Sequence, residues 1–338
     1  MIEIRELTKT FAGRGGMLGR SAVPALRGVD VTIPDRGAVS LIGESGCGKT
    51  TLGRILCGLE QFDGGDIIID GQSLRALKPK DRVRYFRRVQ MIHQDPYSAL
   101  NPTRTIGQIL ADPLALRARQ RDADRDWERS RRAELLELVG LDPDYVLPRY
   151  PHMLSGGMRQ RVVIARALTV DPEVLVADEA VSMIDVSLRL GILQLLGDLR
   201  AKVGVSVLFI THDVATARYI GDGGELYVIY RGMVIEQGQT DTIIHRPAHP
   251  YTQSLMSAIP VLRGIENPGP DAVMPTGPLD ERVESPGCLF EPRCPFAAAD
   301  CAAAVPRLSQ LGGTEQQHAC LYPERRSVVA VPFAGSAT

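Results

Sequence analysis

A glycine-rich stretch, GESGCGKTT at residues 43 to 51, has the composition and spacing of a phosphate-binding loop. Gly43 and Gly48 bracket four residues and precede Lys49 and Thr50. Glycines let backbone amides wrap around phosphate oxygens, the Lys49 ammonium can reach the outer phosphates, and the Thr50 hydroxyl can hold Mg²⁺. An apolar, strand-like run precedes the stretch and a helical segment follows it, as this mechanism requires. The loop also contains Ser45, Gly46, Cys47 and Thr51.

A pair of carboxylates, Asp178 and Glu179, follows the apolar run VLVA much later in the chain. Asp178 could hold the metal, directly or through water, and Glu179 could polarise a water molecule for in-line attack on a phosphoryl group. Acidic pairs at strand ends are common, so this pair gains its meaning from Lys49 upstream. Together the two stretches predict a site that hydrolyses a nucleotide.

Four of the six cysteines lie close together in the sequence, at Cys288, Cys294, Cys301 and Cys320. In a reducing compartment such a group favours metal ligands or ordinary core residues over disulfides. Their separations of five, six and eighteen residues lack the short pairs of most structural zinc sites, so zinc stays open but less favoured. Four thiolates are also the usual ligands of a four-iron four-sulfur cluster. The other two cysteines belong to the glycine-rich loop and the helix after it.

Composition narrows the class of protein. The 338 residues suffice for about two domains, and the formal net charge is -1. Because binding to a phosphate backbone usually needs a basic excess, we expect no nucleic-acid partner and interpret DRVRYFRRVQ at 81 to 90 as a solvated helix face. The stretch MIEIRELTKTF alternates charged and apolar residues, and no run of about eighteen apolar residues occurs, so we expect neither export nor a membrane span.

Short apolar runs predict the elements that must position these residues. We expect buried strands at residues 38–43, 66–70, 89–93, 173–178 and 206–212. Helical segments between several of them indicate an α/β fold with an open, largely parallel sheet, whose ligands bind at the carboxyl ends of the strands. Residues 96–168 lack strand signals, so we expect a helical insertion there, with an apolar stripe formed by Leu135, Leu136, Leu138 and Val139. A Pro/Gly-rich run from Pro260 to Pro286 predicts a linker before a small tail.

The stretch LSGGMRQR at 154 to 161 predicts a second anion site. Ser155 would cap a helix whose first turn, with Gly156 and Gly157, exposes free backbone amides. With this stretch the chain resembles the ATP-binding cassette (ABC) ATPases, whose signature motif reads LSGGQ, here with Met158 in the last place. In that family two subunits clamp ATP between the phosphate loop of one and the signature of the other.

The resemblance implies a P-loop NTPase fold of the ABC type. Residues 1–246 would form the nucleotide-binding domain, with a RecA-like core, an antiparallel β subdomain and a helical subdomain at about 96–168. Residues 247–338 would form a C-terminal extension that carries the four cysteines.

Further site residues follow from the same resemblance. Phe11 resembles the aromatic residue that stacks on adenine, although a lone aromatic after a strand is often a core residue. Gln94 resembles the glutamine that senses Mg²⁺ and water and couples the site to the membrane partner. His212 resembles the histidine that contacts the terminal phosphate. Asp185, in SMID where the family usually has SALD, would face the partner subunit.

The stretches RYPHMLSGGMRQR and HPYTQSLMSAIP, with the cysteine tail, resemble the ATPase subunits of oligopeptide and dipeptide importers. This branch also includes oligosaccharide importers. The resemblance implies ATP hydrolysis with Mg²⁺, two transmembrane permease subunits, a second ABC ATPase that is commonly non-identical, and an extracytoplasmic solute-binding protein acting indirectly. It also implies a peripheral location on the cytoplasmic side of the cell membrane and a structural four-iron four-sulfur cluster on the tail cysteines.

Two other classes stay open. A soluble cassette ATPase that acts on DNA or ribosomes typically has a long coiled-coil insertion or two cassettes, and the sequence contains neither. A non-hydrolysing regulatory subunit is permitted by Ala180, where the family commonly has proline, and by Met183-Ile184 in place of Ala-Leu. These departures remove no functional group, and the lysine, glutamate and histidine of the site are intact.

Overall fold

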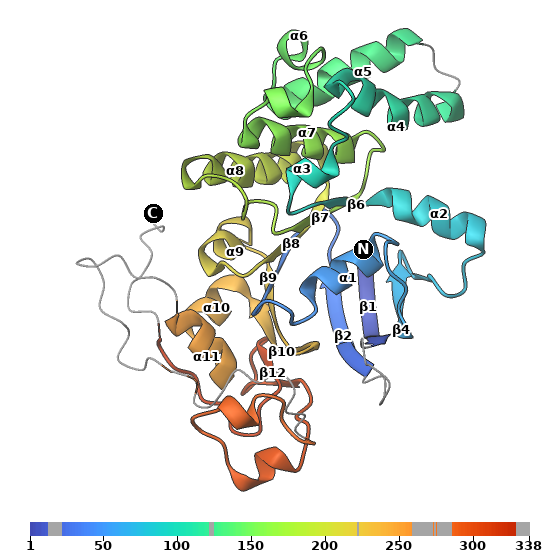
Figure 1. The fold of residues 1–338 in the computed structure, drawn as a ribbon. Helices are drawn as coiled ribbons and strands as arrows, with labels where there is room; N and C mark the ends of the chain where they lie inside the picture. The colour runs from blue at the N-terminus through green and yellow to red at the C-terminus, as the bar shows by residue number, and fades with distance from the viewer. Residues whose placement is uncertain are drawn as a thin grey trace, which may run out of the picture.

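Figure 1 shows the computed structural model of the chain, which describes residues 1–12, 22–121, 125–221, 223–258, 273, 275 and 286–328. A mixed sheet with the strand order β11-β12-β10-β9-β3-β8-β7-β6 forms its centre. Strands β6, β7, β8, β3 and β9 pair in parallel, and β10, β12 and β11 continue the sheet in antiparallel pairs. The strands are β3 (Ala38–Ile42), β6 (Val89–Ile92), β7 (Val174–Asp178), β8 (Ser206–Thr211), β9 (Glu225–Tyr230), β10 (Met233–Gln239), β11 (Ser309–Gln310) and β12 (Gln317–His318).

Helices cover both faces of this sheet, which explains why its central strands are apolar throughout. Alternate side chains of β8 enter different clusters: Phe209 packs with Leu196 of α8, and Leu208 packs with Leu52 of α1. The helices that surround the sheet are α1 (Lys49–Leu56), α2 (Pro79–Arg88), α8 (Val186–Val203), α9 (Val214–Ile220), α10 (Thr240–His245) and α11 (Pro250–Ser257). The strand predictions for residues 38–43, 89–93, 173–178 and 206–212 are confirmed in this sheet.

A second, antiparallel sheet has the order β2-β1-β4-β5. Its strands are β1 (Ile2–Ala12), β2 (Ala22–Ile33), β4 (Gly64–Ile69) and β5 (Gln72–Ser73). The apolar run at 66–70, which we grouped with the parallel strands, belongs to this sheet, because Ile67 and Ile69 pair with Ile4 and Ile2. That grouping was wrong. An apolar run predicts that a strand is buried, but it does not predict which strand will be its neighbour in the sheet.

Helices occupy the chain between β6 and β7, at the top of Figure 1. They are α3 (Pro96–Ala99), α4 (Ile106–Arg121), α5 (Arg125–Leu138), α6 (Pro143–Val146), η1 (Pro151–Met153) and α7 (Gly156–Leu168). From the predicted stripe, Leu135, Leu136 and Val139 are fully buried, and Leu138 packs partly buried against the same cluster. The described part of 96–168 is therefore helical as expected, while the assigned domain bounds remain predictions.

The tail at residues 286–328 packs on the cassette beside α11, and its strand β12 pairs with β10 (Figure 1). It contains the short helices η2 (Glu291–Arg293) and η3 (Ala299–Ala302). Phe290 of the tail contacts Tyr251 of α11. The buried Glu236 carboxylate of β10 accepts hydrogen bonds from the His249 N–H at 3.0 Å and from Gln316 Nε2 at 2.6 Å. The predicted linker lies outside the described residues except for three of its positions.

No helix in the described part of the chain is long and apolar enough to cross a membrane.

Candidate functional site

The glycine-rich loop runs from the end of β3 to the start of α1, and its shape depends on two glycines. Gly48 has φ 107°, and a Cβ atom there would lie 2.4 Å from the Ala25 carbonyl oxygen. At Gly43 a Cβ atom would lie 2.2 Å from the Ile229 carbonyl oxygen. Larger residues at these positions would displace the backbone. The loop can therefore present the free amides at the N-terminus of α1 to an anion.

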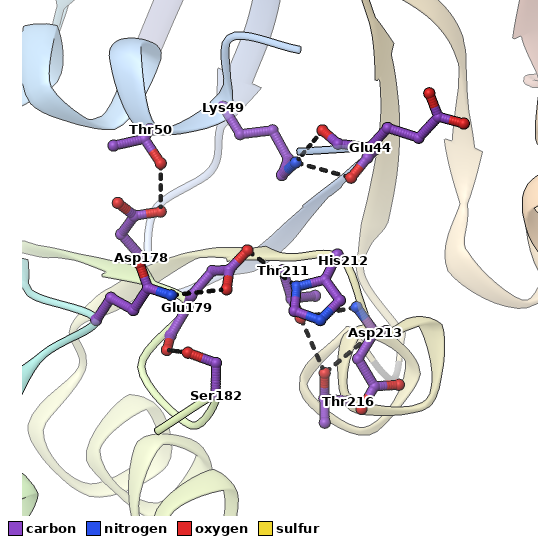
Figure 2. A network of polar contacts seen from close by, with 12 residues as sticks. Glu44, Lys49, Thr50, Asp178, Glu179, Ser182, Thr211, His212, Asp213 and Thr216 are labelled. Carbon is purple, nitrogen blue, oxygen red and sulfur yellow. Dashed lines mark hydrogen bonds and ion pairs between the residues drawn. The ribbon is translucent and has the colours of Figure 1, made fainter. Parts of the chain in front are cut away.

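Lys49 is 4% exposed and lies inside this loop. Its Nζ donates hydrogen bonds to the carbonyl oxygens of Gly43 at 2.7 Å and Glu44 at 2.8 Å (Figure 2). Burial raises the pKa of the nearby Cys47 thiol, and the Lys49 charge only partly opposes this. Ser45 and Gly46 are exposed at the tip of the loop, and Thr51 lies half-buried in α1.

Thr50 and Asp178 bring two oxygen donors together from α1 and β7. Thr50 Oγ1 donates a hydrogen bond to Asp178 Oδ1 at 3.1 Å (Figure 2). Burial raises the pKa of Asp178, and the Thr50 hydrogen bond opposes that effect. Hydroxyl and carboxylate oxygens are ligands that Mg²⁺ accepts together with phosphate oxygens, so these residues fit a nucleotide-bound magnesium ion.

The Glu179 carboxylate is the meeting point of three strand ends. Gln94 Nε2 donates to Glu179 Oε2 at 3.2 Å, and His212 Nδ1 lies 2.9 Å from Glu179 Oε1. Gln94 follows β6, Glu179 follows β7 and His212 follows β8, and these parallel strands are neighbours. Their carboxyl ends therefore place three side chains on one side of the sheet, as Figure 2 shows for Glu179 and His212.

The backbone at Glu179 is strained in a way that aims its side chain. Its φ is 46°, in the left-handed region that residues with a Cβ atom seldom adopt. The Glu179 N–H donates to the Ile210 carbonyl at 2.9 Å, and the Glu179 carbonyl accepts from both the N–H and the hydroxyl of Ser182. Such strain persists where surrounding contacts over-determine the conformation, and it concentrates at functional sites. The carboxylate, with its side chain only 16% exposed, can hold and polarise a water molecule.

The signature stretch lies apart from this cluster, at the start of α7 in the helical part (Figure 1). Ser155 caps α7, its hydroxyl accepting a hydrogen bond from the Met158 N–H at 3.3 Å. Gly156 and Gly157 form the first turn, so the predicted cap is confirmed. Among the described residues, no backbone hydrogen bond joins this stretch to the phosphate loop, and its anion-binding role remains a prediction.

Asp185 and Phe11 also lie apart from the Glu179 cluster. Asp185 is exposed and directly precedes α8, without capping it through its side chain. Phe11 lies near the end of β1 and is 39% exposed, and Lys9 Nζ is 5.0 Å from the centre of its ring. An exposed ring can stack on a base, so the position permits the predicted role without establishing it.

Sequence reasoning missed two kinds of supporting residue. Asp213 caps α9 by accepting the Ala215 N–H at 2.9 Å, which fixes the backbone next to His212. The signal was available, because an Asp before a helical segment is a typical cap. Arg293 forms an ion pair with Glu44 of the phosphate loop, and 249 positions separate them, so no local pattern could have predicted this contact.

The four tail cysteines are brought near one another. The Cys288 N–H donates to the Cys301 carbonyl at 2.8 Å. Burial raises the pKa of the Cys294 and Cys320 thiols to about 11, and the charges of the other tail thiols add to this effect. Within the described ranges, no three or more His, Cys, Asp or Glu side chains are grouped closely enough to hold a single metal ion. The tail cysteines, in the part of the chain that the structure describes, therefore form no ready-made site for a single metal ion, and the expected cluster remains a proposal.

Two families match successive parts of the chain. The family described as ABC transporter matches residues 26–182, and the family described as Oligopeptide/dipeptide transporter, C-terminal region, matches residues 235–301.

Similar proteins cover nearly the whole chain. The Dipeptide transport ATP-binding protein DppF of Escherichia coli is 37% identical over 315 residues, which are 93% of this chain and 92% of that protein. The Di/tripeptide transport ATP-binding protein DppF of Pseudomonas aeruginosa is 37% identical over 327 residues, which are 96% of this chain and 98% of that protein.

Among solved structures, a dimeric post-hydrolysis state of the ATP-binding cassette MJ0796, bound to ADP and Pi, superposes with a TM-score of 0.61. It is 28% identical and covers 71% of this chain and 99% of that one. The chain thus belongs to the ABC ATPases, and specifically to those that carry the oligopeptide/dipeptide transporter C-terminal region.

Proposed function

We propose that this chain is the ATP-hydrolysing subunit that powers an ABC importer for oligopeptides or dipeptides. The observation that carries the hydrolytic part is the convergence of Gln94 and His212 on the Glu179 carboxylate, beside the Lys49 loop. The cargo class is supported by the names of relatives that match this chain along more than nine-tenths of their length. An oligosaccharide importer of the same branch is the alternative.

The residues divide the work of hydrolysis between phosphate binding and water activation. Lys49 and the loop amides hold the outer phosphates, and Phe11 stacks on the adenine. The loop residues whose backbone would surround the phosphates are Gly43, Ser45, Gly46, Cys47, Gly48, Thr50 and Thr51. Thr50, Asp178 and Gln94 would hold Mg²⁺, which neutralises charge on the phosphates when it is bound.

Glu179 accepts a proton from the attacking water or orients it, since its carboxylate is the only acidic side chain bonded to both Gln94 and His212 in the described structure. His212 holds that carboxylate from one side and can contact the terminal phosphate from its exposed ring. Gln94 holds it from the other side, so displacement of Gln94 would change the aim of the base.

A second ABC ATPase subunit completes the site. The first-turn amides of α7, around Ser155, Gly156, Gly157 and Met158, would bind the partner's ATP, and the Met158 N–H also donates to the Ser155 hydroxyl. Asp185, exposed directly before α8, would face the partner. The solved cassette MJ0796 supports the arrangement, since it is dimeric with ADP and Pi.

Two transmembrane permease subunits are the proposed membrane partners, with a solute-binding protein outside the membrane. A groove of about 790 Å³ lies between the helical part and the parallel sheet, lined among others by His93, Tyr97 and Arg166. His93 directly precedes Gln94. A permease segment bound in this groove could therefore move Gln94 relative to Glu179. This surface would place the chain on the cytoplasmic side of the cell membrane as a peripheral subunit.

The four tail cysteines would hold a four-iron four-sulfur cluster of structural role. The effect of Cys288, Cys294 and Cys301 on the pKa of Cys320 shows that the four thiols are near one another, which supports this proposal, and a cluster keeps its thiolates farther apart than a single metal ion does. Anaerobically purified protein should be brown and contain about four irons per chain. Stoichiometric zinc, or four free titratable tail thiols in a folded chain, would refute the cluster and leave the ATPase proposal intact.

The test of function is uptake by the transporter assembled in vesicles from this chain, its sister ATPase and both permeases. Labelled dipeptide should accumulate in the vesicles only when ATP is enclosed with the ATPases on the inner side, when the solute-binding protein is present outside, and when Glu179 is intact. Accumulation of an oligosaccharide but no peptide would favour the alternative cargo. ATP hydrolysis that proceeds equally without permeases or solute would contradict the coupling.

A further inference from the structure

One side chain of the phosphate loop, Glu44, contacts the cysteine-bearing tail. Arg293 donates from Nη1 to Glu44 Oε2 at 2.9 Å and from Nη2 to Glu44 Oε1 at 3.0 Å, forming a bidentate ion pair. The Arg293 side chain is only 12% exposed, so solvent screens this pair less than an ordinary surface pair. Bidentate geometry fixes the direction of the carboxylate as well as its distance.

Aromatic residues hold both partners of this pair in place. Arg293 Nη1 lies 3.4 Å from the Tyr230 hydroxyl, and its guanidinium lies 5.8 Å from the centre of the Phe290 ring. The backbone N–H of Glu44 donates to the Tyr251 hydroxyl at 2.8 Å. Glu44 is therefore anchored through its side chain to the tail and through its amide to α11.

The anchored residue also touches the principal phosphate-binding cation. Lys49 Nζ donates to the Glu44 carbonyl oxygen, and Figure 2 shows the Glu44 carboxylate pointing away from the Lys49 ammonium. A shift of Glu44 would therefore displace an acceptor of Lys49 and change the shape of the loop. An unpaired Glu44 carboxylate would in addition repel a bound polyphosphate.

We propose that Arg293 is a positioning residue of the ATP site, which holds the phosphate loop in its binding shape through Glu44. The tail thereby becomes part of the nucleotide site. The inference rests on the proposed role of the loop in ATP binding, and it adds a residue outside the cassette to that role.

The experiment is a titration of the full-length chain with ATP and Mg²⁺, comparing dissociation constants. Arg293→Ala should raise the Kd for ATP by about tenfold, and Arg293→Lys should recover part of the loss. In a Glu44→Gln background the same Arg293→Ala change should have a much smaller effect, because the two residues act as one unit. Hydrolysis by the assembled transporter at saturating ATP should stay within about twofold of the parental rate, because only binding is perturbed.

Arg326→Ala is the matched control. Arg326 is another tail arginine that pairs with Glu324 and stacks at 4.3 Å on Phe296, without contacting the phosphate loop. Its substitution should leave the Kd for ATP unchanged. An equal loss of affinity in Arg326→Ala, an unchanged Kd in Arg293→Ala, or additive effects of Arg293→Ala and Glu44→Gln would each overturn the proposal.

Lys49→Ala separates this inference from the proposed function. If Lys49→Ala weakens ATP binding and Arg293→Ala does not, the loop binds ATP and only the positioning role of Arg293 fails. If neither substitution changes the Kd, the loop is not the nucleotide site and the proposed function fails with it.

Discussion

Replacement of Glu179 by glutamine separates water activation from nucleotide binding. The carboxylate accepts from Gln94 Nε2 on one oxygen and contacts His212 Nδ1 on the other, at 3.2 and 2.9 Å. Glutamine keeps the volume and one acceptor oxygen, and its amide group can donate to an unprotonated His212 Nδ1. The strained backbone and its hydrogen bonds to Ser182 and Ile210 do not involve the side chain. The geometry of the pocket should therefore survive the substitution.

The rate of ATP hydrolysis should fall, because an amide cannot accept the proton of the attacking water. We expect Glu179→Gln to lower ATP turnover by about 10²- to 10⁴-fold, the usual contribution of a general base. ATP affinity should stay within about threefold, since at most one neutral hydrogen bond is exchanged. Steady-state hydrolysis by the assembled transporter and equilibrium ATP binding, both at the same Mg²⁺ concentration, measure the two quantities separately.

Glu173→Gln is the matched control for this prediction. Glu173 directly precedes β7, the strand that Glu179 follows, and its carboxylate pairs with Arg88 on the surface. Its substitution makes the same chemical change and should leave turnover unaltered. Parental turnover in Glu179→Gln would refute the assignment of the base. A loss of affinity as large as the loss of turnover would show instead that the carboxylate serves nucleotide binding.

Two further substitutions probe the dimer and the tail. A Cβ atom at Gly156 would meet nothing within 4 Å, so Gly156→Asp should fold, but its charge should abolish ATP-dependent dimerisation measured by light scattering while the monomer still binds ATP. Burial lowers the pKa of His249 from 6.5 to about 3, so this group's stabilising contribution is complete above pH 6.5 and is lost as pH falls toward 3. The loss should be about 2 kcal/mol by pH 5, with a smaller one from His318, whose pKa burial also lowers. His249→Asn keeps an acceptor for the Tyr251 N–H. Denaturant unfolding at pH 7 and pH 5 should show a smaller loss of stability in this variant than in the parent. An equal loss in both proteins would contradict the assignment to His249.

The phosphate loop could be predicted because its chemistry is local in sequence. Two glycines, a lysine and a threonine within nine residues specify both the turn and the ligand. Glu179 could be proposed from its place after an apolar run, whereas Gln94 and His212 could be named only through the family resemblance, since 85 positions separate Gln94 from Glu179 and 33 separate His212 from it. The structure supplies the physical reason for their meeting: β6, β7 and β8 are parallel neighbours, so their carboxyl ends coincide.

Long-range pairing was beyond sequence reasoning. The run that became β4 is as apolar as the parallel strands, and only its partner β1 distinguishes it from them. The contact between Arg293 and Glu44 is of the same kind, because each residue alone reads as an ordinary surface charge. Packing of Phe290 and Tyr251 brings the two together, and that packing depends on the tertiary structure.

Two routes reach the ATP site from outside the cassette core, and they end on different chemical groups. The groove lined by His93 leads through Gln94 to the Glu179 carboxylate, the proposed base that activates water. The tail leads through Arg293 and Glu44 to the Lys49 ammonium, the proposed ligand of the phosphates. A change in the groove should therefore alter turnover at saturating ATP, whereas a change at Arg293 should alter affinity. The turn that carries Arg293 begins and ends at two of the tail cysteines, Cys288 and Cys294. A group bound to those two thiols would therefore also fix the position of Arg293, and through it the position of Glu44.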